Sequence, residues 1–205
     1  NGMFAFAVWD RRERLLWLAR DRIGEKPLYY GVQNGTFFFA SELKAIRNHP
    51  DFVPEIDRDT LASFLRFSYV PAPHSIYKGI KKMLPGHVLC IKSPLSDGRL
   101  RPYWSLNDVY RNGIAEPFRG SEEEAAYELE TKLENTVRCR MIADVPLGAF
   151  LSGGIDSSTI VALMQSQSDR PVNTFTVGFN ESEFNEAVYA KEVAQLLGTN
   201  HTELY

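Results

Sequence analysis

The stretch "GAFLSGGIDSSTIVAL" at residues 148–163 decides how the second half of this chain folds. A short apolar run leads into paired glycines and serines around Asp156, and a second apolar run follows. A strand that ends in such a loop and opens a helix presents unpaired backbone N–H groups at the helix start. The glycines allow close approach of a ligand, and the serine hydroxyls add donors. The stretch therefore predicts a cradle for an anion, above all for phosphate.

The loop differs from the Walker A type, which needs a lysine after its last glycine. The nearest basic residues, Arg138 and Arg140, precede the strand. A loop without that lysine suits a pyrophosphate that leaves while the α-phosphorus is attacked. Asp156 would repel phosphate, so two roles stay open for it: capping the helix, or holding Mg²⁺ between the phosphates. The competing interpretation of the whole loop is a tight turn without a ligand.

The sequence around this loop alternates between helical and strand patterns. Ser121 and Glu124 form a capping box at the start of the first helix. Alternation of this kind indicates an α/β unit with a parallel sheet. The expected order is a helix over 121–143, a strand over 146–151, a helix over 156–167, a strand over 172–179, a helix over 184–198 and a strand from 201.

The first half has a different texture, with short aromatic-rich strands separated by turn residues, which favours an antiparallel sheet. Ser41 is the expected N-cap of a short helix. Glycines and prolines make 93–120 loop-rich, and the domain boundary is placed there, giving domains 1–110 and 111–205. The expected elements are strands over 3–10, 14–21, 27–32, 36–43 and 87–92, and helices over 41–49 and 57–67.

Composition narrows the classes of function. The chain has 205 residues, a net charge of −3 and scattered positive charges, which argues against nucleic-acid binding. No apolar run is long enough to span a bilayer, so no membrane partner is expected. The two cysteines, Cys90 and Cys139, lack metal spacing and are expected to be reduced thiols of a cytoplasmic protein. In "ARDRIGEKPLYY", Arg20 and Asp21 are expected to form an ion pair within a charged turn.

Several segments together carry a family resemblance. "SGGIDSS" at 152–158 resembles the pyrophosphate loop of N-type ATP pyrophosphatases. The rest of the chain resembles glutamine-hydrolysing asparagine synthetases, in the family's order. Segments similar to its class II glutamine amidotransferase domain are "GMFAFAVWD" (2–10), "LARDRIGEKPLYY" (18–30) and "FASELKAI" (39–46). "VPAPHSIYKGIKKMLPGH" (70–87) resembles its connecting segment, and "ADVPLGAFLSGGIDSS" (143–158) and "TFTVGF" (174–179) resemble the start of its synthetase domain.

This resemblance implies an α+β region followed by an α/β region. The first would be the C-terminal part of an N-terminal-nucleophile-type glutaminase sandwich with an antiparallel sheet. The second would be the start of a parallel-sheet ATP pyrophosphatase domain. The implied enzyme hydrolyses glutamine and makes asparagine from aspartate through β-aspartyl-AMP, releasing AMP and pyrophosphate. ATP and Mg²⁺ are the implied cofactors, aspartate, glutamine and ATP the small-molecule partners, and a homodimer the expected full-length form.

By the same resemblance, one set of loop residues binds ATP, and Asp156 is also the metal ligand for Mg²⁺. Leu151 and Val177 would line the adenine pocket, although both would equally suit a plain core. The ATP-binding set is Leu151, Ser152, Gly153, Gly154, Asp156, Ser157, Ser158 and Val177.

No catalytic residue is assigned, because the family's N-terminal cysteine nucleophile and its C-terminal catalytic residues have no counterpart here; residue 1 is Asn. The chain is therefore expected to be an internal fragment that alone neither hydrolyses glutamine nor makes asparagine. Three alternatives stay open: a β-lactam synthetase-like cyclase, another cluster-specific amidotransferase on the same scaffold, and a non-catalytic remnant.

Overall fold

A computed structural model of the chain describes residues 2–92, 98–181, 183 and 185–205. It divides into two compact units, Asn1–Pro117 and Phe118–Tyr205, each described here by itself. The boundary expected after residue 110 falls inside helix α3 (Leu106–Ala115), which belongs to the first unit. None of the helices in the described part of the chain has the length and apolar character needed to cross a membrane.

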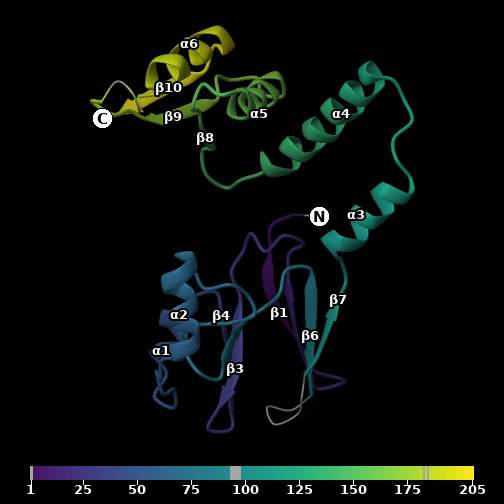
Figure 1. The fold of residues 1–205 in the computed structure, drawn as a ribbon, viewed down its shortest axis with the longest axis vertical. Coiled ribbons are helices and arrows are strands. Elements are labelled where there is room, and N and C mark those ends of the chain that lie inside the picture. The colour runs from purple at the N-terminus through teal and green to yellow at the C-terminus, as the bar shows by residue number, and fades with distance from the viewer. Residues whose placement is uncertain (1, 93–97, 182, 184) are drawn as a thin grey trace. The chain divides into compact units, whose positions relative to one another are not determined.

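The first unit contains two antiparallel sheets (Figure 1). One has the strand order β1-β2-β6-β7 and the other the order β4-β3-β5. The antiparallel pairing expected from the aromatic-rich strands is confirmed. The strands of the first sheet are β1 (Ala5–Asp10), β2 (Leu15–Arg20), β6 (His87–Ile91) and β7 (Arg99–Pro102), and those of the second are β3 (Tyr29–Gln33), β4 (Thr36–Ala40) and β5 (Ile80–Lys82).

The period of two along the strands separates two hydrophobic clusters in this unit. Leu18 on β2 and Leu89 on β6 belong to a buried cluster against which Phe37 on β4 packs. The next residue, Phe38, points to the opposite face of its sheet and packs with Ile46 of α1 (Leu43–Arg47). The second sheet is therefore covered by the first sheet on one side and by a helix on the other.

Local capping explains where the helices of this unit begin. The expectation for Ser41 is wrong: α1 starts at Leu43, and the extended residue Glu42 occupies the cap position without a side-chain capping bond. Asp57 caps α2 (Arg58–Phe67), accepting from the backbone N–H groups of Asp59 and Thr60 at 3.0 Å each. Ser105 caps α3, a helix within the segment expected to be loop-rich. Residues 93–97 of that segment lie outside the described residues.

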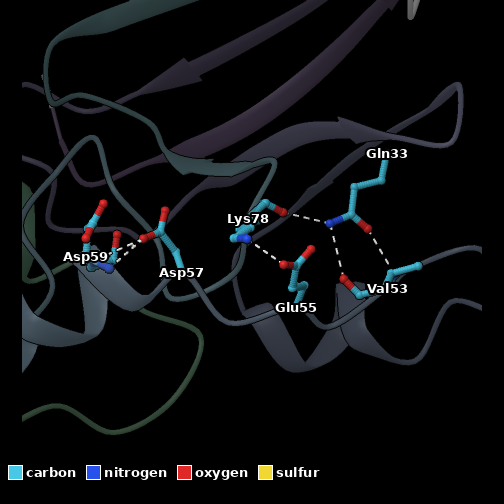
Figure 2. A network of polar contacts seen from close by, with 7 residues as sticks. Gln33, Val53, Glu55, Asp57, Asp59 and Lys78 are labelled. Atoms are coloured by element: carbon cyan, nitrogen blue, oxygen red, sulfur yellow. Dashed lines mark hydrogen bonds and ion pairs between the residues drawn. The ribbon is translucent and has the colours of Figure 1, made fainter.

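Polar contacts join Gln33, at the end of β3, to the segments around Val53 and Lys78, as Figure 2 shows. The Gln33 side chain accepts from Val53 N at 2.9 Å and donates to Lys78 O at 2.7 Å. Lys78 in turn pairs with Glu55. Because these atoms are exposed, their contacts contribute little to the free energy of unfolding, although they connect segments that are distant in the sequence.

The second unit is a parallel sheet of order β10-β9-β8 with helices between its strands, as the alternating pattern predicts (Figure 1). The capping box of Ser121 and Glu124 is present at the start of the first helix. The elements are α4 (Glu122–Arg140), β8 (Gly148–Phe150), α5 (Ile155–Ser166), β9 (Asn173–Val177), α6 (Ala187–Leu197) and β10 (Asn200–Leu204). The start expected for α6 at residue 184 lies outside the described residues.

Candidate nucleotide-binding site

The serine–glycine loop lies where the sequence pattern places it, between the end of β8 and the start of α5. Leu151 is buried in a core with Val161 of α5 and Ala190 of α6. That core anchors the loop on one side, while Ser152 and Gly154 are exposed. The first N–H groups of α5 have no acceptor within the helix. The loop therefore exposes polar groups to solvent while its first residue, Leu151, is held in the core.

Serine hydroxyls hold the loop in shape. The two side-chain oxygens of Ser152 and Ser157 are 2.9 Å apart. Ser157 Oγ also accepts from the Ser152 N–H at 3.2 Å and donates to the Gly154 carbonyl at 3.2 Å. Ser152 Oγ accepts from the Gly154 N–H at 3.3 Å. Several of these bonds are long and exposed, so an anion of higher charge density competes well for the same donors.

Gly153 needs to be glycine for two reasons. Its φ is +80°, in the left-handed region that other residues rarely adopt. A Cβ at this position would lie 2.7 Å from Tyr189 Cβ and 2.8 Å from Ala190 N at the start of α6. The loop is thus pressed against α6, which fixes the direction in which its N–H groups point.

Asp156 and Ser158 occupy the first turns of α5. The N-cap of α5 is Gly154, without a side-chain cap bond, so the capping role left open for Asp156 is wrong. A carboxylate in the first turn, beside a phosphate cradle, fits a magnesium ion that takes its other ligands from phosphate. Ser158 Oγ is a buried atom with no hydrogen-bond partner among the described residues. A buried hydroxyl without a partner is costly, which fits a site completed by a ligand or water.

Leu151 and Val177 line one pocket of about 300 Å³, together with Ser152 and Ser157. Leu151 is 1% exposed and Val177 is 54% exposed. Val177 is therefore no ordinary core residue, and its exposed apolar surface suits a flat base. The pocket joins this apolar wall to the serine–glycine loop within one unit.

Five further residues line this pocket but were not expected from the sequence: Phe150, Phe175, Thr176, Phe179 and Glu186. Phe175 and Thr176 looked like ordinary strand residues. The one sequence signal for these two residues is their position near the end of β9, because the ends of neighbouring parallel strands lie at the same edge of the sheet. Glu186 is the N-cap residue of α6 and places a carboxylate in the lining of the pocket.

The charged turn of the first unit is built differently. Arg20 and Asp21 were expected to pair, but their side chains bind backbone instead. Arg20 donates to the carbonyls of Lys26, Met83 and Gly24 at 2.8, 2.5 and 2.7 Å. Asp21 accepts from the N–H groups of Glu25 and Lys26 at 2.8 and 2.9 Å, and from that of Phe4 at 3.3 Å.

The electrostatics of this turn follow from the same contacts. Burial raises the pKa of the Asp21 carboxyl, but the backbone N–H donors outweigh it and leave that pKa below its usual value. Burial lowers the pKa of Arg20, and attraction to Asp21 opposes that effect. Both groups are ionised at neutral pH and both are nearly fully buried. Their role is to stabilise the turn.

The fold and the site together define a class of protein: an antiparallel two-sheet unit followed by an α/β unit with a phosphate-type loop. Residues 1–104 match the family described as glutamine amidotransferase domain, and residues 128–205 match the family described as asparagine synthase. The first match covers half of the chain, and the chain belongs to the glutamine amidotransferase domain family.

Named relatives share both regions. The chain is 36% identical over 198 residues to "Asparagine synthetase [glutamine-hydrolyzing] 1" of Bacillus subtilis, covering 97% of this chain and 30% of the relative. It is 35% identical over 208 residues to "Putative asparagine synthetase [glutamine-hydrolyzing] 2" of Methanocaldococcus jannaschii, covering 100% and 39%. It is also 34% identical over 217 residues to "Amidase chyE" of Penicillium rubens, covering 98% and 31%. The chain thus spans between 30% and 39% of the length of these relatives.

Proposed function

We propose that this chain belongs to an enzyme that makes asparagine from aspartate and ATP, with glutamine as the ammonia donor. The observation that carries the proposal is the serine–glycine loop, pressed against α6 at Gly153 and open to a pocket lined by Leu151 and Val177. The order of the matched families, residues 1–104 and then 128–205, supports the coupling of a glutamine-dependent unit to this loop.

The loop residues divide between phosphate and base. The hydroxyls of Ser152, Ser157 and Ser158, with the N–H groups of Gly153 and Gly154, hold the β- and γ-phosphates. The adenine ring lies against Leu151 and Val177. Donors that bind both outer phosphates stabilise the negative charge that develops on the departing pyrophosphate. This stabilisation favours displacement at the α-phosphorus.

The reaction then has two bond exchanges. A β-carboxylate oxygen of aspartate bonds to the α-phosphorus while the bond from that phosphorus to pyrophosphate breaks, giving β-aspartyl-AMP. Ammonia released from glutamine bonds to the β-carbonyl carbon, and the bond from that carbon to the AMP oxygen breaks. The amine loses one proton, and the products are asparagine and AMP.

Asp156 is the residue that would hold Mg²⁺ at this loop. The ion neutralises charge on the phosphates and favours departure of pyrophosphate when bound. The position of Asp156 in the first turn of α5 supports this role, because the carboxylate projects from the same turn as the cradle. The expected setting is the cytoplasm, where ATP is supplied and cysteines such as Cys90 stay reduced.

Exchange of labelled pyrophosphate into ATP tests the proposal. The intact protein is incubated with ATP, Mg²⁺ and labelled pyrophosphate, with and without aspartate. Label is expected in ATP only when aspartate is present, because exchange requires reversible formation of the acyl adenylate. Exchange that depends on another carboxylic acid would transfer the proposal to a different acceptor, and no exchange with any acid would contradict adenylation itself.

A further inference from the structure

The peptide group between Leu151 and Ser152 marks the start of the loop. Two side-chain hydroxyls are hydrogen-bonded to this peptide group, one to its carbonyl oxygen and one to its N–H group. Its carbonyl oxygen, on Leu151, accepts a hydrogen bond from Thr176 Oγ1. Its N–H group, on Ser152, donates to Ser157 Oγ at 3.2 Å. One hydroxyl comes from strand β9 and the other from helix α5, so a single peptide is fixed by two different elements.

The hydrogen bond from Thr176 lies where the parallel pairing of β8 with β9 ends. Parallel pairing of β8 with β9 runs through Phe150 and Phe175, and the Leu151 N–H still donates to the Phe175 carbonyl at 2.9 Å. The next bond of a parallel ladder would join the Val177 N–H to the Leu151 carbonyl. The Thr176 hydroxyl reaches that carbonyl instead. The chain can then turn away from the sheet at Ser152.

Burial makes this contact effective. Thr176 is 6% exposed and Leu151 is 1% exposed, so water competes poorly for the bond. Thr176 also lines the pocket beside Ser152 and Ser157. Rotation of the peptide plane would redirect Ser152, whose hydroxyl accepts from the Gly154 N–H, so the buried Thr176 hydroxyl contributes to the orientation of the cradle.

We infer that Thr176 is a positioning residue for the phosphate loop: its hydroxyl holds the Leu151 carbonyl and thereby directs the donors of residues 152–154 at the bound pyrophosphate. This inference rests on the proposed function, since it assigns a role within the same phosphate site. Thr176 itself acts through the loop. Removing its hydroxyl frees the Leu151 carbonyl to pair with Val177, which draws Ser152 back toward the sheet.

The test compares two threonines on one strand. Thr174 lies two residues earlier on the same face of β9, is fully buried, and bonds to Thr199 and His201 at 2.9 Å each, away from the loop. Thr176→Val, Thr176→Ser and Thr174→Val are made in the intact protein. Binding of inorganic pyrophosphate with Mg²⁺ is measured by calorimetry, and the thermal midpoint of each variant is measured alongside.

Thr176→Val is expected to weaken pyrophosphate binding by about tenfold, and Thr176→Ser to restore it. Thr174→Val is expected to lose thermal stability but to keep the affinity. Where Thr176→Val does not fold, Thr176→Ala is read in the same way.

Three results would overturn the inference: wild-type affinity in the hydroxyl-free variant, an equal loss of affinity in Thr174→Val, or no rescue by serine. A wild-type protein that binds no pyrophosphate would overturn the proposed phosphate site, and this inference with it.

Discussion

The turn after β2 and the loop after β8 each contain a glycine with positive φ, yet they are built for different purposes. The turn after β2, residues 21–26, surrounds the buried side chains of Arg20 and Asp21, whose hydrogen bonds go to the backbone of the same unit. The loop after β8, residues 151–158, has exposed or half-buried serines with long bonds and one buried hydroxyl that has no partner among the described residues. Both are rich in polar groups, but the buried charged groups of the first are bonded to backbone, whereas the second presents hydroxyls at its exposed tip.

The two turns differ in where the hydrogen bonds of their polar side chains go. The charged residues Arg20 and Asp21 are more conspicuous than serines, but their side chains are hydrogen-bonded to backbone groups of the same unit. The serine–glycine loop combines a rigid base at Leu151 with open groups at its tip. A functional site is recognised by what its polar groups leave unsatisfied.

The largest expected effect is that of Gly153→Ala on ligand binding. The added Cβ meets Tyr189 and the backbone of Ala190 in a left-handed conformation, so the loop has to move. We expect pyrophosphate affinity, measured by calorimetry, to fall by about a hundredfold. A variant that binds as well as wild type would show that the loop geometry is not required.

Gly24→Ala is the matched change in the other turn. Gly24 has φ +72°, and an added Cβ would lie 2.9 Å from the Arg20 guanidinium. We expect the first unit to lose about 2 kcal/mol of stability, measured by urea unfolding, while pyrophosphate affinity stays unchanged. All three tryptophans of the chain, Trp9, Trp17 and Trp104, lie in the first unit and report its unfolding by fluorescence. Loss of pyrophosphate binding in this variant would erase the distinction between the two turns.

Asp21→Asn tests the electrostatic side of the comparison. The folded pKa of Asp21 lies below its unfolded value of about 3.9, so its ionised form stabilises the fold above that pH, and the contribution is lost as pH falls through the folded pKa. We expect the variant to be about 2 kcal/mol less stable at pH 7. The gap to wild type should narrow in urea unfolding series below about pH 4. If the difference in stability between wild type and Asp21→Asn did not change with pH, the ionised carboxylate would not be the stabilising group.

Ser152→Ala is expected to have a smaller effect on binding than Gly153→Ala. The change removes one hydroxyl but leaves the backbone path intact, so pyrophosphate affinity should fall by about tenfold. Ser168→Ala is the control, since that hydroxyl bonds to the Arg170 carbonyl at 2.8 Å in the turn after α5. Equal losses in the two variants would indicate a general effect of serine removal.

The smallest effect is expected for Lys26→Ala. The backbone N–H and carbonyl of Lys26 bind Asp21 and Arg20, and its side chain is exposed. Stability should change by no more than about 0.5 kcal/mol in urea unfolding. A larger loss would mean that the side chain, and not the backbone, carries the contacts of this turn.

The order of helices and strands in the second unit could be predicted because its apolar periodicity is strong and its capping box is local. The position of the loop between β8 and α5 follows from the same pattern. Helix α3 was not predicted, because the glycines and prolines around it are typical of loops. The capping residue Ser105 was the local signal for this helix. Ser41 misled because a serine one residue before the actual cap is equally plausible from sequence.

The candidate site could be predicted only in part. Residues within the serine–glycine motif were identifiable because they are contiguous. Thr176 was not, because its contact with Leu151 joins residues 25 positions apart and its strand looks like ordinary β structure. The backbone bonds of Asp21 were also beyond sequence reasoning, since opposite charges at adjacent positions suggest an ion pair until the path of the chain is known.

We propose that residues 152–158 hold the pyrophosphate portion of ATP. Backbone amide chemical shifts, followed by NMR while Mg²⁺ and pyrophosphate are added, show whether these residues bind it. We expect saturable shifts at Ser152–Ser158, with the amide shifts of residues 21–26 unchanged. Saturable shifts elsewhere with none in this loop, or no shifts at all, would contradict it.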